Sequence, residues 1–292
     1  MQNKLYKGIV ISNISDLYKV EIEKETKEAG KIYNCNARGK FKADETSPVA
    51  GDIVEIEITD EEKCAGIIEK IIERKNYIKR PKMANLSQII LVLSMKLPKP
   101  DLLLLDKQLV YAEYMKIKPI ICLNKIDLED EEKISQIYNL YKNIGYEVIK
   151  TNAKCGTGIE EIKQKLKNNV TAFSGNSGVG KSTLINSLLG KTIAQEGNIS
   201  NKNKRGKNTT TQVVLYKIDE NSYIADTPGF STFDINEIDK KELAYYFIEF
   251  RNYIKNCEYA DCSHIKEEKC GIKEAVKQGK ISKERYENFL RI

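Results

Sequence analysis

The sequence leads us to expect no segment that directs the protein to or across a membrane. No apolar run among its 292 residues is long enough to span a bilayer, and the first residues, MQNKLYKGIVISN, lack the basic-then-apolar pattern of a secretion signal. Neither sign of charge dominates, because 48 basic residues face 42 acidic ones. We therefore expect a cytoplasmic protein whose net charge of +6 permits a polyanionic partner without requiring one.

Histidine is nearly absent, and the cysteines are odd in number. The chain has one histidine and seven cysteines, and an odd count in a reducing compartment argues against a disulfide framework. We expect Cys35, Cys64, Cys122 and Cys155 to be buried, inert thiols. The other three cysteines lie close to the only histidine, within residues 257–270.

The pattern of apolar residues divides the chain into three domains. Residues 1–72 contain five short β-type runs separated by turn-rich breaks, which predicts a small closed barrel. An OB-fold is favoured, and an SH3-like barrel stays open. Residues 73–234 alternate buried strands with amphipathic helices, as in a mostly parallel α/β sheet. Residues 235–292 read as helical, with helices expected in EIDKKELAYYFIEF, IKEAVKQG and SKERYENFLRI.

The segment GNSGVGKS matches the phosphate-binding loop G-x-x-x-x-G-K-[ST] in full. It stands between a buried strand and an amphipathic helix, so backbone N–H groups and the start of the helix can point at phosphate oxygens. We expect Lys181 to contact the β- and γ-phosphates and Ser182 to bind Mg²⁺. The residues assigned to this loop are Gly175, Asn176, Ser177, Gly178, Val179, Gly180, Lys181 and Ser182.

Two segments after this loop fit the Mg²⁺ and γ-phosphate elements of an NTPase. In IADTPGF, Asp226 ends a buried strand and is expected to hold Mg²⁺, while the N–H of Gly229 is expected to reach the γ-phosphate. The polar, basic stretch before it contains three consecutive threonines, and Thr210 is our choice for the hydroxyl that closes over Mg²⁺.

A base-reading motif lies upstream, although no phosphate loop precedes it in residues 1–120. In NKID, the Asp127 carboxylate can accept both N1–H and N2–H of guanine, a pair of donors that adenine does not offer. Asn124 is expected on the other side of the base and the stem of Lys125 over the ring, with Ile126 between them. TNAK would complete the site through Asn152, Ala153 and Lys154, the Ala153 N–H donating to guanine O6.

The order of these motifs is that of a circularly permuted GTPase domain. In a parallel sheet, joining the original termini and opening the chain elsewhere keeps every strand-end loop at the same edge. The base-reading and phosphate-reading loops can then meet in one pocket. The expected ligands are GTP or GDP with Mg²⁺.

Three cysteines and the histidine near the C-terminus have the spacing of a zinc site. Cys257, Cys262, His264 and Cys270 form C-x4-C-x-H-x5-C. Three thiolates and one imidazole make a closed tetrahedral set, typical of structural zinc. We expect one structural Zn²⁺ that stabilises a helical domain too small to be stable alone.

The motif order, behind a small barrel and ahead of a Cys/His tail, resembles the ribosome small-subunit-dependent GTPase A family, known as RsgA, YjeQ or YloQ. The resemblance covers nearly the whole chain. It implies an OB-fold, a permuted GTPase domain and a zinc domain. It also implies an enzyme that binds the 30S subunit and hydrolyses GTP, with stimulation by the subunit, during late assembly. We expect this enzyme to be a monomer.

One position departs from the family pattern. Asn208 stands where the family usually has a histidine before the threonines, and an amide cannot exchange protons in its place. Phe230 also cannot hydrogen-bond an attacking water. We therefore expect slow intrinsic turnover that a partner accelerates.

Two basic stretches are candidates for contact with 16S rRNA. Arg38, Lys40, Phe41 and Lys42 lie in the barrel, and KQGKISKERY lies near the C-terminus. Two other functions stay open: an RNA-binding module in which GTP sets affinity and turnover is incidental, and a small-molecule P-loop kinase. NKID and TNAK argue against the kinase.

Overall fold

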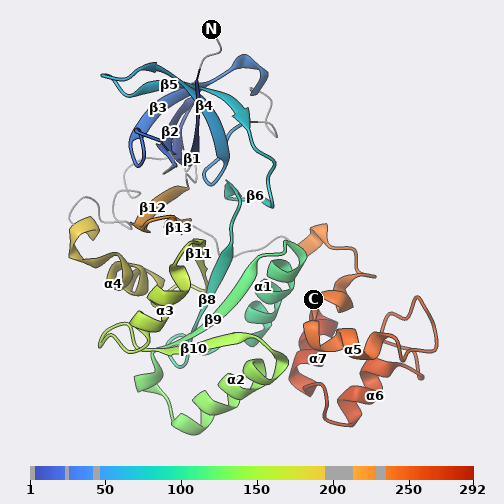
Figure 1. Ribbon diagram of the computed structural model, residues 1–292. Helices are drawn as coiled ribbons and strands as arrows, with labels where there is room; N and C mark the ends of the chain where they lie inside the picture. The colour runs from blue at the N-terminus through green and yellow to red at the C-terminus, as the bar shows by residue number, and fades with distance from the viewer. Residues whose placement is uncertain (1–3, 24–25, 42–46, 195–212, 228–234) are drawn as a thin grey trace. The chain divides into compact units, whose positions relative to one another are not determined.

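The computed structural model describes residues 4–23, 26–41, 47–194, 213–227 and 235–292. These residues form two compact units, whose elements are labelled in Figure 1. Unit 1 holds the described parts of Met1–Gln88, Lys163–Phe173 and Leu188–Phe230, and unit 2 those of Ile89–Ile162, Ser174–Ser187 and Ser231–Ile292. The division into three domains at residues 72 and 234 stays a prediction.

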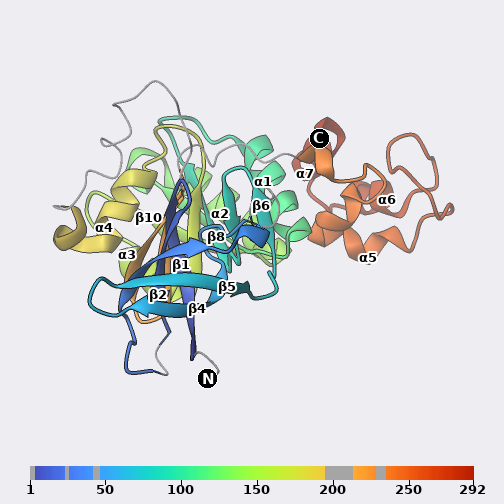
Figure 2. The same cartoon turned by 90° about the horizontal axis from the view of Figure 1, so that it is seen from above.

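Five strands of unit 1 close into the expected barrel, shown in Figure 1 and from above in Figure 2. β1 pairs with both β2 and β4, β4 pairs with β5, and β3 pairs with β2 and, in parallel, with β5. This closed ring is OB-like and confirms the favoured alternative. The strands are β1 (Leu5–Ile14), β2 (Leu17–Ile22), β3 (Ile32–Ala37), β4 (Ile53–Asp60) and β5 (Ala65–Ile71).

Alternating side chains of these strands fill the barrel. Val10, Val20, Tyr33 and Ile56 are fully buried in its core, as expected for strands with one face inside. Cys35 belongs to the same core, and burial raises the pKa of its thiol to about 12.

Two of the four isolated cysteines are buried as expected and two are not. Cys35 and Cys122 are buried, and burial raises the pKa of both thiols to about 12. The expectation is wrong for Cys155, which is exposed, and for Cys64, which is partly exposed. Both lie in turns that follow strands, and such connections usually run over the surface of a protein.

Unit 1 continues beyond the barrel into short strands. A hairpin of β6 (Tyr77–Lys79) and β7 (Lys82–Ala84) follows the barrel in the chain. β12 (Val214–Asp219) and β13 (Ser222–Asp226) are antiparallel, and β13 pairs in parallel with β11 (Val170–Ser174). β1 also pairs antiparallel with β12, with Ser12 opposite Val214, so the barrel is joined to these strands by backbone pairing.

Unit 2 contains the strands that end in the base-reading loops. β8 (Gln88–Ser94) is buried along its whole length, and β9 (Lys118–Asn124) runs parallel to β10 (Glu147–Thr151). Parallel pairing places the ends of β9 and β10, Asn124 and Thr151, opposite each other. The helices are α1 (Leu102–Tyr114), α2 (Glu131–Ile144), α3 (Ile159–Leu166) and α4 (Lys181–Ala194).

The C-terminal part of unit 2 is helical, but not as continuously as the sequence suggested. The stretch 237–250 was expected to be one helix and instead forms 3₁₀ turns, because Phe247 is extended (φ −89°, ψ 100°). Phe247 and Phe250 are thereby both fully buried, with their rings stacked at 4.8 Å. The elements are η4 (Ile235–Glu237), η5 (Leu243–Tyr246), η6 (Ile248–Phe250), α5 (Arg251–Ile254), α6 (Gly271–Lys277) and α7 (Lys283–Arg291).

Among the helices of the described residues, none is both long enough and apolar enough to cross a membrane.

Candidate nucleotide site and metal centre

The glycine loop 175–182 connects β11 to α4 and folds around its own lysine. The Lys181 Nζ donates to the backbone oxygens of Gly175 (2.7 Å) and Asn176 (2.9 Å). Burial lowers the pKa of Lys181. A phosphate group would give this partly buried ammonium a charged acceptor, which makes a stronger hydrogen bond than a carbonyl oxygen.

The base-reading loop touches the glycine loop directly. The Asn124 Nδ2 donates to the Val179 oxygen (2.8 Å), and the Lys125 Nζ donates to the Gly178 oxygen (2.7 Å). Lys125 also binds the Leu97 oxygen. Two motifs that lie about fifty residues apart and in swapped order therefore meet in unit 2.

The same asparagine joins the second base-reading loop. The Asn124 Oδ1 accepts from the Thr151 hydroxyl (3.1 Å) and from the Ala153 N–H (3.3 Å). Asn124 is only 2% exposed, so its amide group is used within the protein on both sides. In this geometry Asn124 links three loops, while its expected contact with the base stays a prediction.

The remaining residues of the two motifs lie in the turns that follow β9 and β10. Asp127 lies in a short 3₁₀ turn, η2 (Ile126–Leu128), and is exposed. Lys125 precedes it in a left-handed conformation (φ 61°), which turns the chain sharply at the strand end. The Asn152 Oδ1 accepts from the Lys154 N–H (3.1 Å) and fixes the TNAK turn.

We expect Gly180→Ala to weaken GTP binding by about tenfold, because a strained backbone and a clash cost on the order of 1–3 kcal/mol. Gly180 has φ +102°, and an added Cβ would lie 2.3 Å from the Asn124 Nδ2. Titration with a fluorescent GTP analogue measures the change. Gly279→Ala is the matched control, since Gly279 also has positive φ (+69°) but nothing within 4 Å. Equal affinities for both variants would contradict the prediction.

The expected Mg²⁺ ligands are described only in part. Asp226 ends β13 in unit 1, and burial raises its pKa to about 6. Ser182 is exposed at the start of α4 in unit 2. Thr210 and Gly229 lie outside the described residues, as do Asn208 and Phe230. A carboxylate that burial solvates poorly is a favourable ligand for a cation.

The four zinc candidates come together in unit 2. All four ligand atoms lie within 4.8 Å of one another. The His264 Nδ1 is 3.5 Å from the Cys257 Sγ and 3.4 Å from the Cys270 Sγ, and these two sulfurs are 3.9 Å apart. Tetrahedral ligands at zinc distances are separated by about 3.5–3.8 Å, so the donor set fits Zn²⁺.

Protonation in this cluster also suits a cation. Burial lowers the pKa of His264 and so favours the neutral imidazole that binds metal. Burial raises the pKa of the Cys262 thiol to about 12. A thiolate at this position therefore needs a bound cation to offset its poor solvation.

The sequence reasoning missed the residue that shapes the loop around the cluster. The Glu267 carboxylate accepts hydrogen bonds from the Ser263 N–H (2.9 Å) and hydroxyl (2.7 Å), and from the N–H groups of Ile265 and Lys266. These bonds lower its pKa to about 2. Spacing within a loop gives no signal for such a contact, because it depends on the left-handed turn at His264 (φ 63°).

The basic candidates for RNA contact have different surroundings. The Arg38 Nε is paired with Glu69 at 2.6 Å, and the Lys40 ammonium lies over the Phe41 ring. Lys42 lies outside the described residues. In the C-terminal stretch, Lys277, Lys280 and Lys283 are exposed, but Arg285 is completely buried and is not part of a basic surface.

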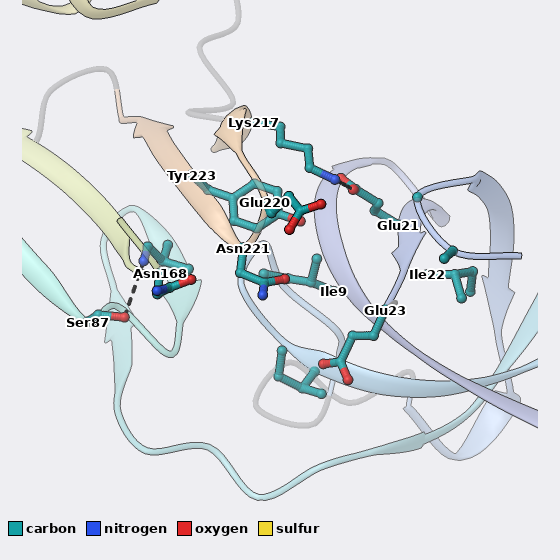
Figure 3. Close-up of a pocket in the computed structure, with 14 residues that line it drawn as sticks. Ile9, Glu21, Ile22, Glu23, Ser87, Asn168, Lys217, Glu220, Asn221 and Tyr223 are labelled. Carbon is teal, nitrogen blue, oxygen red and sulfur yellow. Dashed lines mark hydrogen bonds and ion pairs between the residues drawn. The ribbon is translucent and has the colours of Figure 1, made fainter. Parts of the chain in front are cut away.

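Unit 1 also contains a cavity of about 570 Å³, shown in Figure 3. Ile9, Ile22 and Val170 contribute apolar walls, and Glu21 is buried there and paired with Lys217. The cavity includes none of the residues assigned to GTP, Mg²⁺ or zinc.

Comparisons with known proteins agree with these motifs. A family model described as RsgA GTPase matches residues 71–236, and one described as RsgA N-terminal domain matches residues 7–68. A protein named small ribosomal subunit biogenesis GTPase RsgA from Clostridium acetobutylicum is 45% identical over 97% of this chain and 94% of its own length. Its namesake from Alkaliphilus metalliredigens is 40% identical over 98% and 96%.

Two solved structures match almost the entire chain. YjeQ from Thermotoga maritima has a TM-score of 0.83 at 38% identity, covering 99% of this chain and 97% of its own. YloQ, described as a circularly permuted GTPase, has a TM-score of 0.81 at 32% identity, covering 99% and 93%.

Proposed function

Because this chain belongs to the RsgA GTPase family and is a GTP hydrolase, we propose that it acts in late maturation of the 30S ribosomal subunit. It binds the subunit through 16S rRNA and hydrolyses GTP to GDP and phosphate when the subunit stimulates it. The single observation that carries this function is the meeting of NKID, TNAK and the glycine loop in unit 2. We further propose that it is a cytoplasmic monomer.

The residue roles follow from the chemistry of GTP. The β- and γ-phosphates are bound by the Lys181 ammonium and by N–H groups of residues 175–182. These groups stabilise the negative charge that develops on the leaving oxygen in the transition state. Asp127 selects guanine through N1–H and N2–H, with the stem of Lys125 over the ring. Ser182, Thr210 and Asp226 are the residues that would hold Mg²⁺, and the ion would offset phosphate charge.

Hydrolysis is the step that the partner controls. Asn208 and Phe230 offer no group that can take a proton from water, so the free enzyme turns over slowly. Contact with the subunit supplies or orients the group that activates the attacking water. Loss of the γ-phosphate then lowers the affinity for the subunit, and the protein leaves it.

A multiple-turnover phosphate-release assay with purified subunits tests this function. We expect 30S subunits to increase the rate and 50S subunits to leave it unchanged. An unchanged rate with 30S would favour a GTP-regulated RNA-binding module with incidental turnover. Equal affinity for ATP and GTP would favour a P-loop kinase.

We also propose one structural Zn²⁺ held by Cys257, Cys262, His264 and Cys270, supported by their mutual distances. The ion would hold the turn 257–270 against α6 and α7. In support of this, the Gly271 N–H donates to the Cys257 Sγ (3.3 Å), and the Tyr286 hydroxyl donates to the His264 oxygen (2.7 Å).

Cys262→Ser is expected to lose the zinc and to lower Tm by about 10 °C. The reason is that a domain with a small core loses the stabilisation that the bound metal gives it. Elemental analysis and thermal unfolding followed by circular dichroism give the two numbers. Cys155→Ser is the control, because Cys155 is exposed and lies outside the cluster. One zinc per chain in Cys262→Ser would refute the ligand assignment.

A further inference from the structure

Helix α1 contacts the glycine loop with one side. The Gln108 Nε2 donates to the buried Ser174 hydroxyl (3.0 Å), directly before the loop. Asp101 caps the helix by accepting from the Leu104 N–H (3.0 Å), and its other oxygen accepts from the Asn176 amide (3.3 Å).

The space between α1 and the loop is nearly filled. A cavity of only about 10 Å³ lies there, lined by Leu104 and Leu105 of the helix and by Gly175 and Val179 of the loop. Close packing of this kind transmits small displacements, because neighbouring groups have no room to absorb them.

The opposite side of α1 is held by the C-terminal helix α7. Asp106 is fully buried and accepts from Arg285, from the Asn288 Nδ2 (2.7 Å) and from the Tyr141 hydroxyl of α2 (2.8 Å). Two positions separate Asp106 from Gln108, which places them about 200° apart around the helix. Val110, one turn after Asp106, lies in the apolar core that contains Phe247 and Phe289.

Arg285 is the centre of this contact. Its guanidinium is completely buried, and besides Asp106 it donates to both oxygens of Glu249 (2.8 and 3.0 Å). The Phe247 ring lies 4.7 Å from it. A buried guanidinium with two carboxylate partners has one defined position, since any shift leaves a buried charge unpaired.

We propose that Arg285 is a positioning residue for the glycine loop and that α1 couples the C-terminal helices to the nucleotide site. When a partner binds the C-terminal part, α7 shifts and Arg285 pulls Asp106 with it. Because Asp106 belongs to α1, the helix moves, and Gln108 and Asp101 shift relative to the glycine loop. Because coupling is reciprocal, nucleotide bound at the loop changes the affinity of the C-terminal part for its partner by the same factor. This inference rests on the proposed nucleotide site.

Three variants of the full-length protein test the coupling, each checked for folding by circular dichroism and for its zinc content. Arg285→Lys keeps the charge and loses the two-pronged contact with Glu249. Gln108→Met keeps the length and loses the bond to Ser174. Arg251→Met is the matched control, because Arg251 also binds α1, at Glu113 (2.9 Å), but is 46% exposed. The readout is the affinity for a fluorescent GTP analogue in the absence of subunits.

We expect Arg285→Lys and Gln108→Met each to weaken binding by about tenfold, within the usual range of coupling between sites. The double variant should lose no more than about twofold further, because both changes break one connection. Arg251→Met should stay within about twofold of the wild type. If Arg285→Lys does not fold, Asn288→Ala is measured in its place, because it removes one of the two bonds from α7 to Asp106 and leaves that of Arg285.

A folded Arg285→Lys with full zinc content and the affinity of Arg251→Met would overturn the coupling. So would a double variant whose losses multiply. A wrong assignment of the nucleotide site gives a different result. In that case the wild type would bind the GTP analogue no better than the corresponding ATP analogue, and the coupling would be contradicted as well.

Discussion

Asp127→Asn is expected to lower GTP affinity on the order of 10⁴-fold. A binding site that hydrogen-bonds a polar group of its ligand discriminates on this scale against a ligand that cannot make the bond. The new amide presents an N–H to the guanine N2–H, donor against donor. Xanthine carries an oxygen at that position, so the same variant should bind xanthosine triphosphate well. Competition between the two nucleotides for a fluorescent analogue measures both changes.

Asp130→Asn is the matched control for this exchange. Asp130 lies three residues further along, and its side chain is 82% exposed. It should keep the wild-type preference for GTP. If Asp127→Asn also kept that preference, Asp127 would not contact the base.

Lys181→Ala is expected to reduce GTP hydrolysis by about 10²–10³-fold or more, since removing one preorganised group that stabilises transition-state charge costs that much. The same change removes the hydrogen bonds from the Lys181 ammonium to the Gly175 and Asn176 oxygens, which stabilise the folded loop. Single-turnover hydrolysis at saturating GTP separates the chemical step from weaker binding. Both should suffer, and the rate more than the affinity.

The comparison variant for Lys181 is Lys63→Ala. The Lys63 side chain is 82% exposed and is paired with Asp60 (3.5 Å). It should hydrolyse GTP at the wild-type rate. A Lys181→Ala rate within twofold of that control would remove Lys181 from the catalytic machinery.

Local patterns predicted the parts of this protein that depend on neighbouring residues in the chain. The five barrel strands, the continuous apolar strand β8 and the end of α2 at Gly145 (φ 116°) all follow from alternation, apolar runs and glycine caps. The convergence of NKID with the glycine loop could also be predicted, because strand order in a parallel sheet places strand-end loops together.

Contacts between distant residues could not be predicted in this way. Arg285 and Asp106 are 179 positions apart, and in SKERYENFLRI the arginine has the spacing of a solvated basic face. Only the packing of α7 on α1 buries it. The bridging role of Asn124 has the same origin, since its amide bonds reach Val179 and Ala153.

The 3₁₀ turns of residues 235–250 show tertiary packing overriding a helical pattern. EIDKKELAYYFIEF has good helix formers, yet Phe247 and Phe250 can both enter the core only if the chain is extended at Phe247. Sequence periodicity contains no information about which aromatic residues a distant helix such as α7 will cover.

A crystal structure with a non-hydrolysable GTP analogue and Mg²⁺ tests most directly whether base-reading and phosphate-reading loops share one pocket. The account predicts that the Asp127 carboxylate lies about 3 Å from both N1 and N2 of guanine, while the Lys181 Nζ has left the Gly175 oxygen for a phosphate. A purine ring bound away from Asp127, with the phosphates still in the glycine loop, would contradict it.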